Sequence, residues 1–189
     1  RMAMVVIAGA AFSTLAADYY WLTDAGSGNW NDASKWNPST GVPGSADSGL
    51  FTELQTAPFT VTLTNDVSAK LAFGSSDATK PVVATFELNG YTLTTLSTPF
   101  DAHRALDWTV LNGTLRTDPT AAAINIGYVQ GDWVPKVTLG AGAVYLQNSP
   151  NTINVGSRSA GELVIRDGGR FVTENSSLAT ALRLGYTTT

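Results

Sequence analysis

The sequence predicts an all-β protein with the architecture of a parallel β-helix, and three observations lead to this prediction. A four-residue pattern returns at a step of 29 residues, in Ile124-Asn-Ile-Gly127, Ile153-Asn-Val-Gly156 and Leu182-Arg-Leu-Gly185. Short alternating apolar and polar runs, rich in Thr and Val, fill the chain from Phe59 onward, as in strands with one buried face. Glycines separate these runs. A fixed period in this range is typical of a solenoid, in which each unit buries its apolar face against the next.

The composition argues against two classes of site. The 189 residues carry 11 Lys and Arg against 15 Asp and Glu, a net charge of −4, with no basic stripe. The chain therefore lacks the electrostatic footprint of a nucleic-acid-binding protein. It contains no cysteine, which excludes disulfides, thiolate zinc sites and a cysteine nucleophile.

The first 17 residues have the features of a secretory signal peptide. An apolar run from Met4 to Phe12 follows a basic residue, and small residues that include Ala16 and Ala17 come next, as signal peptidase prefers. We therefore expect cleavage after Ala16 or Ala17 and export of the mature chain. The run is too short to span a bilayer as a stable anchor. The alternative is that it forms a buried strand or helix of the fold.

Residues 18–58 are expected to form an N-terminal cap. This segment is rich in Trp, Gly, Ser, Asp and Pro and shows weak strand patterning. It contains Trp21, Trp30 and Trp36. An open end of a solenoid exposes core side chains and unpaired backbone groups, and large aromatic side chains can cover such an end.

Residues 59–189 are expected to form the solenoid repeats, with about five coils over the chain and truncation at the C-terminal end. Each 29-residue unit contains three apolar runs, which fits three strands and three corners in one coil. Val137 with Leu139, and Leu163 with Ile165, are expected to point inward and to stack. Leu182 would then begin a coil whose remaining strands are missing.

Four glycines are expected to mark the same corner of successive coils. They are Gly90, Gly113, Gly142 and Gly169, at steps of 23, 29 and 27 residues. The alternative is an antiparallel hairpin stack or a β-sandwich. Asn89-Gly90 and Asn112-Gly113 each lie between alternating runs, which is the strongest short-range pattern for a two-residue hairpin.

The segment after the expected signal peptide resembles a known family. Gly28-Asn-Trp30 is followed by Trp36, by Gly41-Val-Pro43, by Asp47 and by Phe51. This order, with the Ile-Asn-Ile-Gly repeats downstream, resembles the secreted bacterial autotransporter-associated β-strand-repeat proteins, which are large passenger-like surface proteins. The resemblance implies a right-handed β-helix with a surface or adhesin-like role, and it carries no catalytic set.

The candidate ligand-binding residues are Trp21, Trp30, Trp36 and Asp47. Aromatic faces stack on sugar rings, and a carboxylate such as that of Asp47 can bind the sugar hydroxyls. The alternative role of the three indoles is to plug the end of the solenoid. Exposed and coplanar Trp30 and Trp36 would support a sugar platform, whereas full burial of both would remove it.

Catalysis has few candidates. His103, the single histidine, lies in Asp101-Ala-His103-Arg104 and could serve acid–base chemistry. No nucleophile motif accompanies it, and one histidine cannot supply a multi-histidine zinc set. The acids at expected corners are Asp66, Asp118, Asp132 and Asp167. A polysaccharide-active enzyme would need at least two acids about 5–10 Å apart across a groove.

Together these observations predict a fragment of an exported, non-enzymatic bacterial surface protein whose β-helix serves as a structural, adhesin-like stalk. We expect no cofactor, no metal, no nucleic-acid partner and no transmembrane segment in this sequence. The expected partners are glycans or other cell-surface and extracellular polymers. The expected location is the cell surface or the medium, with outer-membrane association if the full chain carries a C-terminal barrel. Two alternatives stay open: a carbohydrate-binding module that uses the Trp cluster, and a polysaccharide-active β-helix enzyme.

Overall fold

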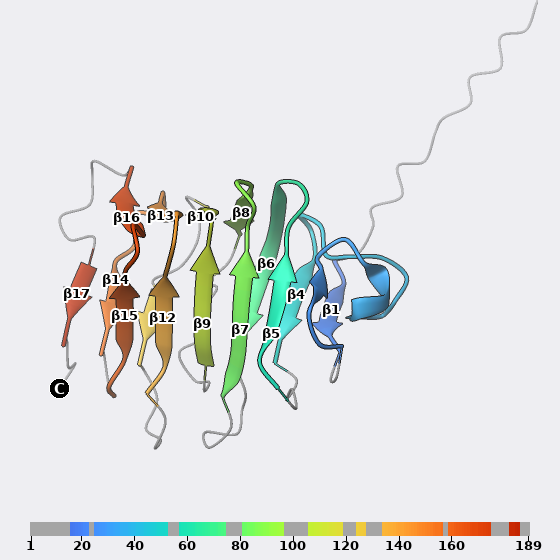
Figure 1. Cartoon of the computed structure of the whole chain (residues 1–189), viewed down its shortest axis with the longest axis horizontal. Coiled ribbons are helices and arrows are strands. Elements are labelled where there is room, and N and C mark those ends of the chain that lie inside the picture. Colours follow the sequence, from blue (N-terminus) through green and yellow to red (C-terminus); the bar gives the residue numbers. More distant parts are fainter. Residues whose placement is uncertain are drawn as a thin grey trace, which may run out of the picture.

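Three β-sheets run along the long axis of the molecule, and the chain winds from one sheet to the next (Figure 1). The computed structural model describes residues 16–22, 25–52, 57–74, 81–96, 106–118, 124–127, 134–156, 159–174 and 182–185. Neighbouring strands pair in parallel across successive coils, which confirms the predicted parallel β-solenoid. The expected signal peptide lies almost wholly outside the described residues.

Sheet 1 has six strands in the order β2-β5-β7-β9-β12-β15. Their bounds are Gly28–Asn29, Phe59–Thr62, Val82–Glu87, Leu106–Leu111, Lys136–Leu139 and Glu162–Ile165. Sheet 2 has eight strands in the order β3-β1-β4-β6-β8-β10-β13-β16. Their bounds are Trp36–Asn37, Asp18–Trp21, Ser48–Phe51, Val67–Phe73, Thr92–Thr95, Gly113–Thr117, Ala143–Gln147 and Arg170–Thr173.

Sheet 3 has the order β11-β14-β17, with bounds Ile124–Ile126, Ile153–Val155 and Leu182–Leu184. These strands carry the 29-residue repeat. The register pairs Ile124 with Ile153 and Ile153 with Leu182, so the sequence period is the period of the coil. In the part of the chain that the structure describes, the single helical element is the 3₁₀ turn Ala33–Lys35. No helix there is long and apolar enough to cross a membrane.

The glycine that ends each sheet 3 strand is required by the backbone. Gly127, Gly156 and Gly185 have φ values of 84°, 73° and 65°, a region that side chains with a Cβ rarely adopt. A Cβ on Gly127 would also lie 2.4 Å from the carbonyl oxygen of Ala160 in the next coil. Glycine therefore permits both the left-handed corner and the close approach of neighbouring coils.

The Asn-Gly pairs form corners between sheets, so the hairpin alternative is wrong for the described strands. Asn89 and Gly90 have φ values of 51° and 86°, as both central residues of a type I′ hairpin turn would. They nevertheless join β7 in sheet 1 to β8 in sheet 2. The Gly90 N–H donates to the carbonyl oxygen of Asn112 in the next coil, because the corners stack on one another. Among the described strands the single antiparallel pair is β1 with β3.

The corner register differs by one residue from the predicted glycine series. Pairing of Thr92 with Thr114, and of Thr114 with Val144, continues to Arg170. The equivalent corner residues are therefore Gly90, Asn112, Gly142 and Gly168, and each has a positive φ. Gly113 and Gly169 follow one position later in their corners. There an added Cβ would lie 2.5 Å from the Leu88 Cβ and 2.3 Å from the Leu139 carbonyl oxygen, respectively.

Inward side chains of sheet 1 form columns that run along the axis. One column contains Trp108, Val137 and Leu163, and the next contains Val110, Leu139 and Ile165. Val137 and Leu139 are buried as predicted, and Leu163 packs against the core. Ile165 aligns with them but is 46% exposed, because β15 is the outermost strand of its sheet.

An aromatic stack fills the N-terminal half of the interior. Its members are Trp21, Trp30, Trp36, Phe51, Phe59, Phe73, Phe86 and Trp108, all buried. Phe51 and Phe73 stack with ring centroids 4.8 Å apart, and Phe73 stacks on Trp108 at 4.4 Å. Because these rings come from successive coils, the stack joins the cap to the repeats.

Candidate functional site

The three cap tryptophans close the N-terminal end of the solenoid from inside. The Trp21 and Trp36 rings meet edge to face at 5.0 Å with an interplanar angle of 88°, and Trp30 meets Trp36 at 5.0 Å and 67°. The indole N–H of Trp36 donates to the Trp30 carbonyl oxygen at 2.9 Å, and that of Trp21 donates to the Gly26 carbonyl oxygen at 3.3 Å. Such contacts satisfy the polar edge of a buried indole.

These positions correct the hypothesis of a sugar platform. Trp21, Trp30 and Trp36 are between 0% and 1% exposed, and the Trp30 and Trp36 rings are not coplanar. A ring that packs edge to face in the core offers no open face to a sugar. The indoles are instead buried inside the cap, the arrangement that the alternative of an internal plug requires.

Asp47 also has a structural role in the cap. Its Oδ1 accepts a hydrogen bond from the Ala17 N–H at 2.9 Å, and its Oδ2 accepts one from the Gly44 N–H at 3.0 Å. The first bond ties the chain before β1 to the loop before β4, and the second closes that loop. Asp47 therefore holds together two adjoining segments rather than presenting a carboxylate to a ligand.

The polar residues around Trp30 form a small surface network. Asn31 donates from Nδ2 to the Thr64 hydroxyl oxygen at 3.0 Å and contacts the Asn65 side chain. Asp32 is the N-cap of the 3₁₀ turn and accepts from the Ser34 hydroxyl and N–H at 2.6 and 3.0 Å. These two hydrogen bonds hold the pKa of Asp32 below its ordinary value. The network fastens the cap to the corner of the next coil.

Two of the acids that the sequence placed at corners, Asp66 and Asp167, make separate local contacts. Asp66 accepts a hydrogen bond from the Thr92 N–H at 2.8 Å, and Asp167 lies 3.6 Å from Arg166. His103 and Asp132 lie outside the described residues. Within residues that the structure describes, no three His, Cys, Asp or Glu side chains come close enough to hold a metal ion.

A groove of about 340 Å³ crosses the outer face of sheet 1. Thr85, Thr109 and Thr138 form an in-register column along it. Asp107 is the one carboxylate among the described residues that line it, and its Oδ2 lies 2.8 Å from the Lys136 Nζ. These described residues therefore do not supply the pair of facing acids that glycoside hydrolysis requires.

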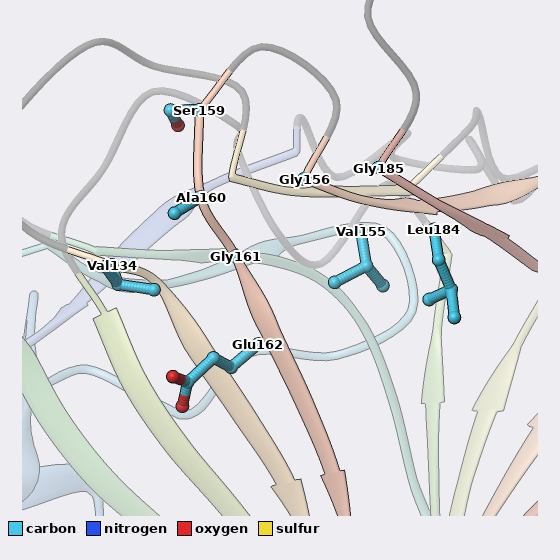
Figure 2. A pocket seen from close by; sticks show the side chains of 9 residues that line it. All are labelled: Val134, Val155, Gly156, Ser159, Ala160, Gly161, Glu162, Leu184 and Gly185. Atoms are coloured by element: carbon cyan, nitrogen blue, oxygen red, sulfur yellow. The ribbon is translucent and has the colours of Figure 1, made fainter.

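A second hollow, of about 540 Å³, lies where sheet 3 turns back towards sheet 1. Figure 2 shows Val155 and Leu184 extending the same way from neighbouring strands, with Glu162 on the other side. Among the described residues that line it, Glu162 is the one with a charge. These residues are mainly apolar and include no pair of acid–base groups.

Comparison of the chain with protein-family models, with curated proteins and with solved structures finds no match in any of the three. The resemblance to the bacterial β-strand-repeat proteins therefore stays a prediction. Function has to be argued from the architecture itself.

An internal polar column is a feature that the sequence analysis missed. Thr95, Thr117 and Gln147 align on the inner face of sheet 2, and all are buried. The Thr117 hydroxyl oxygen accepts from the Asn148 N–H at 3.1 Å, and the Gln147 Nε2 donates to the Asn151 carbonyl oxygen. The contacts go to backbone near the turn into sheet 3. The column therefore stabilises the turn between sheets 2 and 3, and we assign it a structural role.

Proposed function

We propose that this chain forms a rigid, capped rod in an exported bacterial surface protein, where it acts as a structural stalk with an adhesive role. The observation that supports this proposal is the parallel pairing that runs through sheet 1, and through sheet 2 from β1 onward, behind a sealed N-terminal end. The rod has no catalytic part in this proposal, and its outer surface supplies the contacts to extracellular polymers.

The stiffness of the rod follows from the direction of its hydrogen bonds. Backbone hydrogen bonds between parallel strands run along the solenoid axis, and each coil adds roughly 4.8 Å of length. Inside, apolar columns such as Val110 with Leu139 stack in the same direction. A tilt of one coil would disturb the hydrogen bonds and the packing together, so bending is costly.

The sealed end supports the same proposal. β3 pairs antiparallel with β1, with Tyr20 opposite Asn37 and Trp21 opposite Trp36. Pro38 follows β3 directly and has no N–H to offer to another strand. An edge strand that offers few free backbone donors prevents strands of other molecules from adding to the sheet, which a rod on a cell surface has to avoid.

Single-molecule pulling tests the mechanical part. One coil spans between 22 and 30 residues in sheet 2, so a chain pulled from both ends should lengthen in steps of roughly 26 residues, or about 90 Å. The expected record is a series of such steps. A single cooperative rupture at low force would contradict a stalk built of coils.

Two further experiments test export and adhesion. Residues 1–17 fused to alkaline phosphatase should give periplasmic activity, and residues 18–34 in the same fusion serve as the control. The purified chain should bind glycan arrays, matrix proteins or bacterial cells. Retention on none of these surfaces would remove the adhesive role and leave the mechanical role unaffected.

A further inference from the structure

A column of threonine side chains runs along the middle of the outer face of sheet 1. Thr85, Thr109 and Thr138 are partners in register on β7, β9 and β12, and they line the groove of about 340 Å³. β5 and β15 flank these three strands, and Figure 1 shows the five strands side by side. The column therefore lies within the sheet, and neither end of the sheet creates it.

The hydroxyls of this outer threonine column are available to a ligand. The Thr117 hydroxyl on the inner face of sheet 2 accepts from a backbone N–H, whereas the three outer hydroxyls have no hydrogen-bond partner among the described residues. Thr138 is only 3% exposed although it alternates with inward-facing Val137 and Leu139, so it forms a recessed floor. Each hydroxyl donates one hydrogen bond and accepts up to two.

The charges of the groove are paired. Asp107 and Lys136 are partners in register on one wall, and the distance from Asp107 Oδ2 to Lys136 Nζ is 2.8 Å. Arg166, which also lines the groove, lies 3.6 Å from Asp167. A polyanion is held by cations that are free to neutralise it, and the described lining pairs both of its cations with carboxylates. The groove is therefore complementary to an uncharged ligand.

The spacing of the column defines the shape of that ligand. Neighbouring parallel strands lie about 4.8 Å apart, so three hydroxyls follow a straight line of roughly 10 Å along the solenoid axis. A matching partner is a straight chain that offers hydroxyl and ether oxygens along one edge at a similar interval. Chains of β-linked glucose are straight and uncharged in this way, whereas chains of α-linked glucose curve.

We propose that the groove of sheet 1 binds a straight, uncharged polysaccharide chain along the solenoid axis, through the hydroxyls of Thr85, Thr109 and Thr138. This inference rests on the proposed adhesive role and names both the surface and the class of polymer. The Asp107–Lys136 pair supplies a charged acceptor and a charged donor to sugar hydroxyls at the wall. The described lining has no aromatic ring, so recognition depends on hydrogen bonds to the edge of the chain.

Titration with defined hexasaccharides tests the class of ligand, by calorimetry or by saturation-transfer NMR. Cellohexaose, which is straight and uncharged, should bind. Maltohexaose has the same sugar in a curved chain, and hexagalacturonate carries carboxylates, so each should bind at least about tenfold more weakly. Equal binding of cellohexaose and maltohexaose, a preference for hexagalacturonate, or no binding of cellohexaose would overturn the proposal.

Replacement of hydroxyls by methyl groups tests the location of the site. The double variant Thr85→Val with Thr109→Val keeps the β-branched shape that suits a strand. It should bind cellohexaose about twentyfold more weakly, since each lost hydrogen bond accounts for roughly fivefold. Thr114→Val is the matched control, because Thr114 also faces outward from a central strand, in sheet 2, and it should bind like the unmodified chain.

Unchanged binding by the double variant would overturn the groove as the site. The outcome is distinguishable from failure of the adhesive role. A chain that is retained on cells or glycan arrays without binding cellohexaose contradicts the groove alone. A chain that binds cellohexaose through Thr85 and Thr109 but is retained on no such surface supports the groove and contradicts the adhesive role.

Discussion

The side chain of Asn154 donates a hydrogen bond from Nδ2 to Oδ1 of Asn125, its register partner 29 residues earlier, at 2.8 Å. The two amides face outward from neighbouring strands of sheet 3, and the next pair in register, Ile126 with Val155, faces inward. A repeated residue in the sequence thus becomes a repeated contact along the axis. The direction of this bond makes the two asparagines chemically different, although the sequence repeat makes them look equivalent.

That difference predicts unequal effects of the same substitution. Asn154→Asp removes the donor and places a carboxylate against the Asn125 oxygen, so we expect a loss of about 1–2 kcal/mol in the free energy of unfolding at pH 7. Asn125→Asp keeps an acceptor opposite the Asn154 amide and should cost less. Urea unfolding of the two variants measures this. Equal losses would show that the amide contact does not contribute to stability.

Alanine substitutions at two corner glycines should distinguish the energetic cost of a steric contact from that of backbone strain. Gly127→Ala combines a φ of 84° with a Cβ placed 2.4 Å from a carbonyl oxygen, and it should cost at least about 3 kcal/mol of unfolding free energy. Gly168→Ala has a φ of 83° but no atom within 4 Å of the added Cβ. It should cost only about 1–2 kcal/mol. Thermal or urea unfolding compares them, and a cost at Gly168 equal to that at Gly127 would mean that the close approach of the coils is unimportant.

The Asn89-Gly90 corner should resist deamidation in the folded chain. Succinimide formation requires the Gly90 nitrogen to attack the Asn89 side-chain carbonyl carbon, which demands a close and aligned approach. The Gly90 N–H is bound to the Asn112 carbonyl oxygen, and the Asn89 Nδ2 donates to the Leu63 carbonyl oxygen at 3.0 Å. Mass spectrometry after incubation at pH 8 should show at least tenfold slower isoaspartate formation than in the urea-unfolded chain. Similar rates in the two states would mean that this corner opens readily.

Tyr145 should make the fold sensitive to alkali. Burial raises the pKa of Tyr145 far above its ordinary value. Its contribution to stability is therefore complete below about pH 10, the unfolded pKa, and decreases as the pH rises towards the folded pKa. Tyr145→Phe keeps the stacking on Phe171, whose ring centroid is 5.5 Å away, and should lose less stability than the wild type above pH 10. Tyr91→Phe, at an exposed position, is the control and should follow the wild-type curve.

The architecture could be predicted because the repeated residues lie within strands that pair in register. Ile124, Ile153 and Leu182 align in the structure at the spacing that the sequence shows. The corner series was misplaced by one residue at two corners. At one, two adjacent glycines occur and Gly168, not Gly169, is the equivalent residue; at the other, Asn112 adopts a φ of 51° where the other coils have glycine. Asparagine tolerates that conformation, so a search for glycine alone passes over it.

The candidate site was harder to predict, because residue type does not reveal which way a side chain points. Tryptophans in a polar, glycine-rich segment suit a sugar platform or an internal plug equally well, and only the burial of Trp30 and Trp36 separates the two. The same holds for threonine. Thr109 faces outward from sheet 1 whereas Thr117 is buried in the core, and both lie in similar alternating runs.

Three tryptophans lie at one end of the molecule, so their fluorescence reports on that end. Trp21, Trp30 and Trp36 lie in the cap, Trp108 lies among the repeats, and Trp133 lies outside the described residues. With three of the five tryptophans in the cap, intrinsic fluorescence is weighted towards the N-terminal end, whereas the far-ultraviolet dichroism of the strands reports on the whole length. If the coils fray from the end that carries Leu184, the dichroism will fall while the emission of the indoles stays blue. Comparison of the two optical signals would then show from which end the rod unwinds.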